Sequence, residues 1–414
     1  MRAEVIAVGS ELLTPSKLDT NSLYIARELG QLGIPLVRKS VVGDDRELLC
    51  DEIRRAQGCS DLVFLSGGLG PTLDDLTRDA ASDATGRPLL MDESIVREIE
   101  ARFRSFGRPM AEVNKRQAYL LKGAVKLDNP RGTAPGQWLQ DGSRVLVLLP
   151  GPPRELKPMF AEECLPRLRA MTTSRPLHSW HGRVTGIGES DLEQRIGPLY
   201  SPCRTIATTI LSSPGDVQIH LQGQHGGAVD RLAGQISAEL GDAVYSTDGR
   251  PLPEIVADLL RRKGLHLAVA ESCTGGLLSG RLTDVPGSSE FFAGGIVSYS
   301  NGAKAAWLGV ARDTLERFRA VSRQTAREMA ERARARAIEA LGEPAVGLST
   351  TGYAGPSGGS SEDRPGTVYI GLADSAGSLV RRRQFGRGRK RVRTLAVLST
   401  LDLFRRRALG LRIP

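Results

Sequence analysis

The sequence predicts an α/β protein in three parts: a parallel-sheet domain, a small α+β unit in the middle, and a second α/β domain. Short apolar segments alternate with amphipathic segments over residues 1–170 and again over residues 249–414. This alternation is typical of parallel sheets joined by right-handed crossovers. Residues 171–248 do not show it. The chain of 414 residues is also longer than most single domains.

The first part reads as a βαβαβ unit followed by a later strand. Runs rich in Val, Ile and Leu predict strands in EVIAVG, PLVRKSVVG, DLVFLSGG and RVLVLLPG. Between the first three, apolar side chains at helical spacing predict helices in TNSLYIARELGQLG and ELLCDEIRRAQG. Because parallel strands end at one edge of a sheet, we expect the loops that follow them to lie together.

The middle part has strands in TIATTI and DVQIHLQG, a strand and a helix in RVTGIGESDLEQRIG, and no cluster of catalytic-type residues. The linker-like STDGRPLP at 246–253 ends it. In the last part the helix EIVADLLRRKG leads to the strand HLAVAES, and FFAGGIVSYS, AVGLSTTG and GTVYIGLAD are further strands. Helices are predicted over about 322–341 and 388–409.

The composition predicts a cytoplasmic protein with no membrane span, no zinc site and no disulfide. No apolar run reaches about 18 residues, and the start MRAEVIAVGSELL lacks the basic and long apolar segments of a signal peptide. The five cysteines are scattered, with no CxxC pair. That pattern favours a reducing compartment.

The net charge of +9 is concentrated at the end of the chain. Residues 381–414 hold twelve Arg and Lys against Asp402, a local charge of +11, so the rest of the chain carries −2. Three interpretations remain open: a solvated basic helix face, a phosphate-binding edge for a small anionic substrate, or a nucleic-acid patch. Only Phe385 and Phe404 interleave with the basic residues, which argues against nucleic acid as a partner.

The stretch GGLGPTLDDLT at 67–77 follows a predicted strand. Glycines at such a corner let backbone N–H groups approach a ligand, and a helix beginning near Thr72 would add its positive dipole end. The corner therefore suits a phosphate, although a tight turn is the alternative. Arg154, in the proline-stiffened PGPPREL, could hold a second phosphate.

Acidic residues follow the same strands. Glu11, Asp44, Asp74 and Asp75 all lie in loops at the predicted carboxyl edge of the sheet. Carboxylates beside a phosphate site favour a bridging divalent cation. Helix capping by Asp44 or Asp74 is the alternative.

The stretch AVAESCTGG places two candidate nucleophiles, Ser272 and Cys273, on a strand-to-helix turn. The five histidines are poorly placed to serve as a base, since four lie in the middle part and His266 begins the strand. Lys304, in SYSNGAK, follows a neighbouring strand and could act as a neutral base, with Tyr299 as relay or orienting group. The alternatives are a solvated lysine and a tyrosine that only packs on the core.

A second glycine-rich loop, STTGYAGPSGG, follows the strand AVGL. Its backbone amides could hold a phosphate or an oxyanion, and a flexible lid is the alternative.

Cys273 is expected to face away from Lys304 if Ser272 faces it, because successive side chains of a strand alternate.

The first part resembles the CinA family of competence/damage-inducible proteins. The motifs that carry the resemblance are GSELL, DTNS, VGDD, SGGLGPTLDDLT, GTAPG and PGPPREL. The resemblance implies a molybdopterin-binding-like fold and a metal-dependent ADP-ribose pyrophosphatase using a divalent ion of the Mg or Co class. It implies metal ligands among Glu11, Asp44, Asp74 and Asp75. It implies nucleotide and phosphate binding by the set Asn21, Gly67, Gly68, Gly70, Thr72 and Arg154.

The last part resembles the CinA C-terminal domain, whose stand-alone relatives are nicotinamide-nucleotide amidases. AESCTGG, the FxxGxVSYSNxxK pattern, TTGxAGPxGG and GTVYIG carry this resemblance. It implies a catalytic set of Ser272, Tyr299 and Lys304, with no cofactor. It implies substrate contacts from Cys273, Thr274, Gly275, Thr351, Gly352, Gly355 and Arg389, the last of these for the substrate phosphate.

The resulting expectation is a bifunctional hydrolase of pyridine-nucleotide recycling. One site would deamidate nicotinamide mononucleotide, and the other would cleave ADP-ribose. The alternatives are a nucleotide- or pterin-binding regulatory protein linked to competence or DNA damage, and a molybdopterin-handling enzyme. The family resemblance makes us expect a homodimer with small-molecule nucleotides as partners, and it leaves open a monovalent cation.

Overall fold

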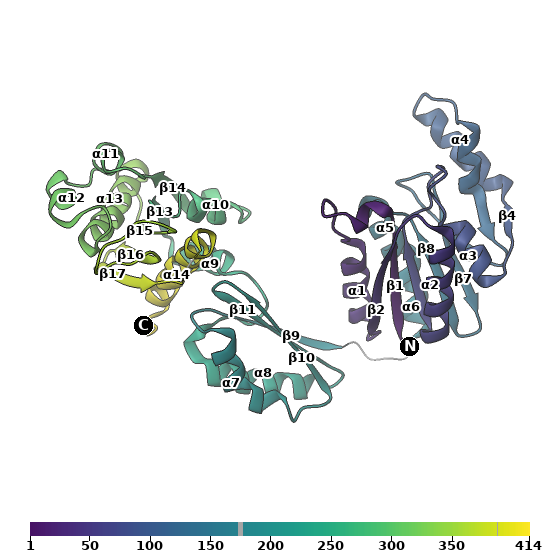
Figure 1. The fold of residues 1–414 in the computed structure, drawn as a ribbon, viewed down its shortest axis with the longest axis horizontal. Helices are drawn as coiled ribbons and strands as arrows, with labels where there is room; N and C mark the ends of the chain where they lie inside the picture. Colours follow the sequence, from purple (N-terminus) through teal and green to yellow (C-terminus); the bar gives the residue numbers. More distant parts are fainter. Residues whose placement is uncertain (173–176, 387) are drawn as a thin grey trace. The chain divides into compact units, whose positions relative to one another are not determined.

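The computed structural model describes residues 1–172, 177–386 and 388–414; Arg387 of the basic segment lies outside these ranges. The chain forms two compact units, Met1–Leu177 (unit 1) and His178–Pro414 (unit 2) (Figure 1). Both contain helices packed on mixed sheets with parallel strands, so the predicted α/β class is confirmed. The middle sheet and the last sheet share unit 2, and the three-part division stays a prediction.

Unit 1 is built on a six-stranded sheet of order β2-β1-β3-β8-β7-β6 (Figure 1). β2, β1, β3 and β8 are parallel, as their apolar runs predict, and β7 and β6 add antiparallel strands that the sequence analysis did not anticipate. A two-stranded ribbon, β4-β5, is separate. The strands are β1 Ala3–Val8, β2 Leu36–Val42, β3 Leu62–Ser66, β4 Leu89–Met91, β5 Tyr119–Leu121, β6 Val125–Leu127, β7 Gly136–Asp141 and β8 Arg144–Leu149.

Helices cover both faces of this sheet. Alternate residues of β1 enter two cores, Val5 with α1, α5 and α6, and Ile6 with α2 and α3. The helices are α1 Asn21–Gln31, α2 Arg46–Cys59, α3 Thr77–Thr85, α4 Glu93–Ser105, α5 Pro153–Met159 and α6 Leu165–Met171, with shorter helical turns at Ser10–Leu13, Glu112–Ala118 and Phe160–Cys164. Burial on both faces explains why β1, β3 and β8 are mostly apolar, whereas the edge strand β2 exposes Arg38 and Lys39.

One predicted boundary in unit 1 is wrong. The helix expected to begin near Thr72 begins at Thr77 instead. Both carboxylate oxygens of Asp75 accept hydrogen bonds from residues 70–72, and these bonds hold the segment as a loop. Asp74 and Asp75 therefore precede the helix and do not cap it.

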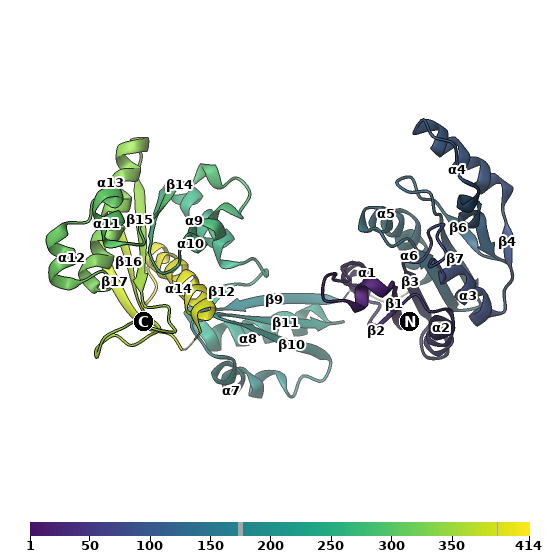
Figure 2. The same ribbon diagram turned by 45° about the horizontal axis from the view of Figure 1, so that its top comes forward.

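Unit 2 contains two sheets (Figure 2). A four-stranded antiparallel sheet, β10-β11-β9-β12, packs one face on α7 and α8. The five-stranded sheet β14-β13-β15-β16-β17 has β14, β13 and β15 parallel, with β16 and β17 antiparallel at one side. The strands are β9 His178–Val184, β10 Ile206–Ser213, β11 Asp216–Gly223, β12 Val244–Ser246, β13 His266–Glu271, β14 Phe292–Val297, β15 Ala345–Gly352, β16 Thr367–Asp374 and β17 Gly377–Gln384.

The five-stranded sheet lies between two helical layers. On one face α9, α10 and α14 form the largest core, and on the other α12 and α13 pack on β13 and β15 (Figure 1). The helices are α7 Glu189–Tyr200, α8 Gly226–Leu240, α9 Leu252–Lys263, α10 Leu277–Thr283, α11 Asn301–Ala303, α12 Arg312–Phe318, α13 Arg323–Leu341 and α14 Arg389–Leu409, with shorter turns at Gly241–Ala243, Ser288–Glu290 and Lys304–Leu308.

The basic segment at the end of the chain is not one solvated helix face. Arg381, Arg382 and Arg383 belong to strand β17, which the sequence analysis did not predict. Arg405 and Arg406, on α14, are buried and share Asp402 as an ion-pair partner. The cluster therefore serves several different contacts.

The contact between α13 and β15 leaves no room for a side chain at Gly347. A Cβ there would lie 1.9 Å from the carbonyl oxygen of Ala330 and 2.8 Å from the backbone nitrogen of Arg334. We expect Gly347→Ala to destabilise unit 2 by about 1 to 3 kcal/mol, because the clash is with backbone. Gly234→Ala, in α8 with nothing within 4 Å of its Cβ, is the matched control and should be neutral or stabilising. Scanning calorimetry of both variants tests this; equal transition midpoints would contradict it.

Candidate functional site

Ser272 lies at the carboxyl edge of the five-stranded sheet, at the end of the interior strand β13. It directly follows Glu271, the last residue of β13, which pairs with β14 on one side and β15 on the other. The Ser272 N–H donates to the carbonyl of Thr350, at 2.9 Å. Ser272 is 8% exposed, so its hydroxyl is held at the edge of the sheet where ligands of α/β folds bind.

Lys304 reaches this hydroxyl from the loop after β14. Its Nζ lies 3.0 Å from Ser272 Oγ, 2.8 Å from the carbonyl oxygen of Ser298 and 3.3 Å from that of Tyr299. Lys304 is 0% exposed, and no carboxylate of the described residues forms an ion pair with it. Burial lowers the pKa of its ammonium group to about 8.

These three contacts match the hydrogen-bonding capacity of a neutral amine. Such an amine has two N–H donors and one lone pair. The two carbonyls can accept both N–H groups, which leaves the lone pair for the hydroxyl of Ser272. Lys304 also opens a single π-helical turn, Lys304–Leu308, and such turns are frequent at functional sites.

Glu271 is a site residue that the sequence analysis did not assign. Its carboxylate is fully buried and accepts from the backbone N–H groups of Gly276, Leu278 and Ser279 and from Ser279 Oγ, at 2.6 to 3.1 Å. It therefore caps the start of α10, where negative charge is favoured. Its position directly before the turn, in AESCTGG, was the sequence feature that could have indicated this capping role.

This cap limits which amides could face a ligand. Gly276 donates to Glu271, and Gly275 donates to the carbonyl of Ser272. Among the described residues, no carbonyl or carboxylate accepts from the N–H groups of Cys273 and Thr274. These two amides are the ones that the turn leaves for a developing negative charge.

Cys273 points the other way. Its side chain is buried in the main core of unit 2 with Leu278 and Ala354. Burial raises the pKa of this thiol to about 12. The alternation of the strand therefore directs Ser272, and not Cys273, toward Lys304.

Three more predicted residues lie together beside the turn. One guanidinium nitrogen of Arg389 donates to the hydroxyl of Tyr299, at 3.0 Å, and the other to the carbonyl of Gly355, at 3.3 Å. Tyr299 is 59% exposed, so its ring lies toward solvent. Its backbone carbonyl, and not its phenol, contacts Lys304; a relay role for the phenol remains a prediction.

Other predicted substrate residues make contacts within the protein. Thr274 Oγ1 and Thr350 Oγ1 share a hydrogen bond of 2.7 Å, and Thr351 Oγ1 donates to the carbonyl of Ala320. A Cβ at Gly352 would lie 2.5 Å from the carbonyl oxygen of Thr367. These residues build the walls of the site, and Gly275 supplies the positive φ of 58° that its turn requires.

Arg393 completes the turn. It donates through Nε and a terminal nitrogen to the carbonyl of Thr274, at 3.1 and 2.6 Å. Arg393 belongs to the basic segment at the end of the chain, but it was not among the predicted site residues. The nucleophile turn is thus held at its amides by Glu271 and at its carbonyl by Arg393.

In unit 1 the predicted loops do share one edge of the sheet. Ser10, after β1, and Asp44, after β2, exchange two hydrogen bonds, Ser10 N–H to Asp44 Oδ2 at 2.8 Å and Asp44 N–H to Ser10 Oγ at 2.9 Å. Gly67, after β3, sits so close to the carbonyl of Val8 that a Cβ would lie 2.3 Å from it. The helix cap at this edge is Asp45, which accepts from the N–H of Leu48.

The four acids do not form a metal site in this arrangement. Asp44 is bonded to Ser10, and Glu11 pairs with Lys17 at 2.9 Å. Asp75 accepts from the backbone of Gly70 and Thr72, and Asp74 is exposed. In the described parts of the chain, no group of three or more His, Cys, Asp or Glu side chains is placed to hold a metal ion. Three of the four predicted ligands therefore already make polar contacts within the protein, and the fourth, Asp74, lies exposed.

The glycines of the predicted phosphate cradle are also used internally. A Cβ at Gly68 would lie 2.3 Å from Thr77 Oγ1, and one at Gly70 the same distance from Asp75 Oδ2. The sequence analysis missed Arg78, which is 3% exposed and donates to the carbonyls of residues 69 and 70. Burial lowers the pKa of its guanidinium to about 10. This loop is held from within.

Of the remaining predicted residues, Asn21 is buried and Arg154 is exposed. Asn21 Nδ2 donates to Ser66 Oγ at 2.9 Å and to the carbonyl of Gly151 at 2.7 Å. Its Oδ1 is buried and has no hydrogen-bond partner among the described residues. Arg154 is exposed on α5. A ligand at this edge of the sheet would contact Asn21. The side chain of Arg154 lies on the surface of α5 instead.

Comparison with known proteins identifies relatives along the whole chain. The family described as "CinA C-terminal domain" matches residues 249–408, and "Probable molybdopterin binding domain" matches residues 4–170. A "CinA-like protein" of Solibacter usitatus is 47% identical over 416 residues, which cover 99% of this chain and 99% of the relative. A "Putative competence-damage inducible protein" of Alkaliphilus oremlandii is 40% identical over 418 residues, 99% of each chain.

The chain belongs to the CinA family.

Solved structures with family names also match. The protein CinA from Thermoplasma acidophilum is 32% identical, covering 40% of this chain and 97% of that chain, with a TM-score of 0.37. A competence/damage-inducible protein CihA from Agrobacterium tumefaciens is 38% identical, covering 37% and 90%, with a TM-score of 0.34. The resemblance predicted from the motifs is confirmed, and so is the molybdopterin-binding-like character of the first domain.

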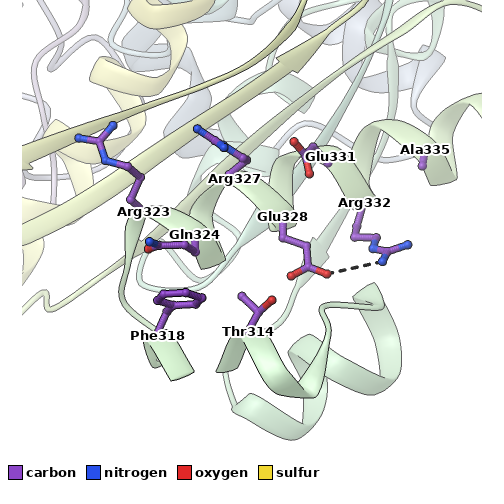
Figure 3. A pocket seen from close by; sticks show the side chains of 9 residues that line it. All are labelled: Thr314, Phe318, Arg323, Gln324, Arg327, Glu328, Glu331, Arg332 and Ala335. Carbon is purple, nitrogen blue, oxygen red and sulfur yellow. Dashed lines mark ion pairs between the residues drawn. The ribbon is translucent and has the colours of Figure 1, made fainter. Parts of the chain in front are cut away.

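The candidate site around Ser272 and Lys304 is distinct from a hollow beside α13. That hollow, of about 560 Å³, is lined by charged and polar residues of α12 and α13 (Figure 3). Glu328 and Arg332, one turn apart on α13, form an ion pair at 3.5 Å in its lining, and neither Ser272 nor Lys304 lines it. No helix of the described residues has the length and apolarity to cross a membrane.

The buried Cys273 should resist alkylation. At about pH 8 its thiol is protonated, because its pKa is about 12, and thiolates are the reactive form. Exposed Cys59 is the internal control. Mass spectrometry after iodoacetamide treatment should find Cys59 modified and Cys273 unmodified until the chain is denatured. Equal labelling of the two would show that Cys273 is accessible.

Proposed function

We propose that the C-terminal domain is a serine amidase that converts nicotinamide mononucleotide to nicotinate mononucleotide and ammonia. The observation that carries the proposal is the 3.0 Å contact between Ser272 Oγ and the Nζ of Lys304, which is fully buried and has no carboxylate partner among the described residues. A nucleophile beside a base that is neutral near its working pH is the basic requirement of acyl transfer. The family resemblance supplies the substrate.

The first step would be attack on the carboxamide. Neutral Lys304 accepts the proton of the Ser272 hydroxyl as the oxygen bonds to the carboxamide carbon. The N–H groups of Cys273 and Thr274 have no acceptor among the described residues, so they are the candidates to stabilise the oxyanion. Their position would depend on Glu271 and Arg393, which hold the turn.

Three proton transfers would complete the reaction. The protonated Lys304 returns its proton to the amide nitrogen, and ammonia leaves an ester on Ser272. Lys304, neutral again, then accepts a proton from water as the water oxygen attacks the ester, and it returns that proton to Ser272 Oγ as the ester bond breaks and nicotinate mononucleotide is released. Arg389, already bonded to Tyr299 and Gly355, is the proposed contact for the substrate phosphate.

For the first domain the expected ADP-ribose pyrophosphatase has less support. Its predicted metal ligands are bonded within the protein, exposed, or paired with lysine. Nucleotide binding at the edge near Asn21 remains compatible with the buried, unpartnered Oδ1. We therefore derive no hydrolytic step for this domain.

Removing each candidate nucleophile in turn should show whether Ser272 or Cys273 attacks the substrate. We expect Ser272→Ala to lower kcat for ammonia release from nicotinamide mononucleotide by about 1,000-fold or more, because the covalent route is lost. Cys273→Ala should retain most of the activity, since its thiol faces the core. Ammonia release in a coupled assay measures both variants. Loss only in Cys273→Ala would overturn the choice of nucleophile.

The rate should also depend on the protonation of Lys304. The pKa of about 8 belongs to a base that must be neutral, so kcat/KM should rise about tenfold per pH unit below that value and level off above it. Lys304→Arg, which stays charged, should lose the activity. A profile that is flat from about pH 6 to about pH 9 would show that another group is the base.

A further inference from the structure

A hollow of about 430 Å³ lies within unit 2, between the four-stranded sheet and the helices α9, α10 and α14. Val217 and Ile219 of β11 face the core formed with α7 and α8, so the residues between them face the hollow from the other side of the sheet. A Cβ at Gly215 would lie 2.9 Å from Leu395 Cδ2 and 3.0 Å from Leu398 Cδ1. The hollow therefore lies where the β10–β11 hairpin meets α14.

The sheet contributes a charged pair that is already satisfied. Arg183 donates through Nε and one terminal nitrogen to the two carboxylate oxygens of Asp216, and its other terminal nitrogen donates to the carbonyl of Gly249, at 3.3 Å. Tyr245 Oη also donates to Asp216, at 2.8 Å. Asp216 is buried, and a buried charge that is paired in this way does not require a charged ligand.

The other charged residues leave the lining slightly negative. Arg281 and Asp284, both exposed, form an ion pair at 3.9 Å at the end of α10. Glu254 lies in the first turn of α9, where negative charge is favoured, and has no cation partner among the described residues. Two arginines and three acids in the lining sum to a charge of −1. The hollow therefore disfavours an anion, including a phosphorylated nucleotide.

Two uncharged polar side chains on the sheet side have unused hydrogen-bonding capacity. Gln218 lies directly across from Arg183, and Ser213 directly across from Asp216, so all four share one face of the sheet. The side-chain oxygen of Gln218 lies 3.4 Å from Nε2 of His220. Among the described residues, nothing accepts from Gln218 Nε2 or pairs with the Ser213 hydroxyl. These groups suit the neutral polar atoms of a ligand.

The wall across from the sheet is apolar. It is formed by side chains of α10, of the residue pair that follows it, and of α14, and three proline rings border it: Leu277, Val285, Val397, Leu398, Leu401, Pro214, Pro251 and Pro253. The first five belong to the main core of unit 2 or pack against it. An apolar wall with a few polar groups facing it, and a volume of this size, are typical of sites for small organic ligands.

We propose that this hollow binds an uncharged organic molecule of the nucleoside class. Its aromatic ring lies against the leucines of α10 and α14, and its ring nitrogens and hydroxyls bond to Gln218 and Ser213. Neither Ser272 nor Lys304 lines the hollow, so the proposal stands whether or not the amidase assignment holds.

The hollow beside α13 is a poorer candidate. Five of its nine lining residues are charged (Figure 3), against five of eighteen here. Its apolar surface comes from Phe318 and Ala335 alone, and its ion pair lies open to solvent on the helix surface. It therefore offers an aromatic ring less apolar contact than the hollow bordered by α10 and α14.

The test is calorimetric titration of the full chain with adenosine, an uncharged nucleoside. We expect Ser213→Trp to weaken one binding event about tenfold or more, because the indole occupies the space that the ligand needs. Ser212→Trp is the matched control, since Ser212 is also exposed at the end of β10 but points to the other face of the sheet. Identical isotherms for the two variants, including absence of binding in both, would overturn the proposal.

A second pair of variants tests the polar contact. Gln218→Leu should weaken the Ser213-dependent event about three- to tenfold, because one hydrogen bond is lost. Gln222→Leu, on the same face of β11 but outside the lining, should bind adenosine as the wild type does. Equal affinities of these two variants would overturn the proposed recognition of a nucleoside.

Two further titrations test the ligand class and the location. Adenosine monophosphate should bind at the Ser213-dependent site more weakly than adenosine, because the lining is negative; tighter binding there would show that the hollow takes an anion, and the uncharged class would be wrong. Arg389→Gln should leave the Ser213-dependent event intact. Loss of adenosine binding in Arg389→Gln, with none in Ser213→Trp, would place the nucleoside at the candidate active site and overturn the proposal.

Folding of the variants is checked by thermal unfolding. Ser213→Trp and Ser212→Trp should unfold close to the wild-type midpoint, because both positions are exposed. If Ser213→Trp unfolds early, the comparison of Gln218→Leu with Gln222→Leu decides. Adenosine should raise the midpoints of the wild type and of Ser212→Trp by the same amount, and that of Ser213→Trp by less. An equal rise in all three would contradict binding in the hollow.

Discussion

The candidate active site depends on a buried lysine, Lys304, for which the described part of the chain supplies no counter-ion. Full burial of Lys304 opposes the charged form, and the two carbonyls of Ser298 and Tyr299 take the N–H groups of the neutral form. An added carboxylate would restore the charge and remove the base. The surrounding core, with Leu308 and Val310 on the same turn, must therefore stay apolar for Ser272 to be activated. Here burial, which usually limits ionisable groups in a core, is what makes the group useful.

The second constraint is the geometry of the turn that carries Ser272. A helix that begins five residues after a candidate nucleophile, as α10 does after Ser272, could direct its free amides toward the reacting atoms. In this chain Glu271 takes those amides, so the helix dipole holds the turn in place. The N–H groups of Cys273 and Thr274 precede those amides in the chain. They are the ones that a substrate in the proposed reaction could use. Arg393 fixes the same turn from α14, which links the catalytic corner to the helix that also begins with Arg389.

Much of this could be predicted, and the misses have physical causes. Strand-edge logic placed Ser272 near Lys304 because both follow adjacent parallel strands. Alternation along the strand separated Ser272 from Cys273. The role of Glu271 was missed because one sequence does not show whether a carboxylate beside a turn faces a ligand or a helix end. In unit 1 the acids Asp44 and Asp75 looked like metal ligands by position, whereas their oxygens close loops with Ser10 and with the amides of Gly70 and Thr72. The sequence was enough to predict that these acids lie at one edge of the sheet. It was not enough to predict their hydrogen-bond partners, because these depend on distances between side chains.

The positive charge at the end of the chain shows the same distinction. The composition indicated an anionic partner without saying which arginines would meet it. Arg405 and Arg406 are the most buried of them, and they use their charge on Asp402 and on the backbone carbonyl of Asp242 in the neighbouring sheet domain. Arg389 and Arg393 organise the candidate active site. A charge that is already paired cannot also recruit a ligand at no cost, since the pair must first be broken. The arginines of this segment that already hold a carboxylate are therefore poor candidates for recruiting an anionic ligand.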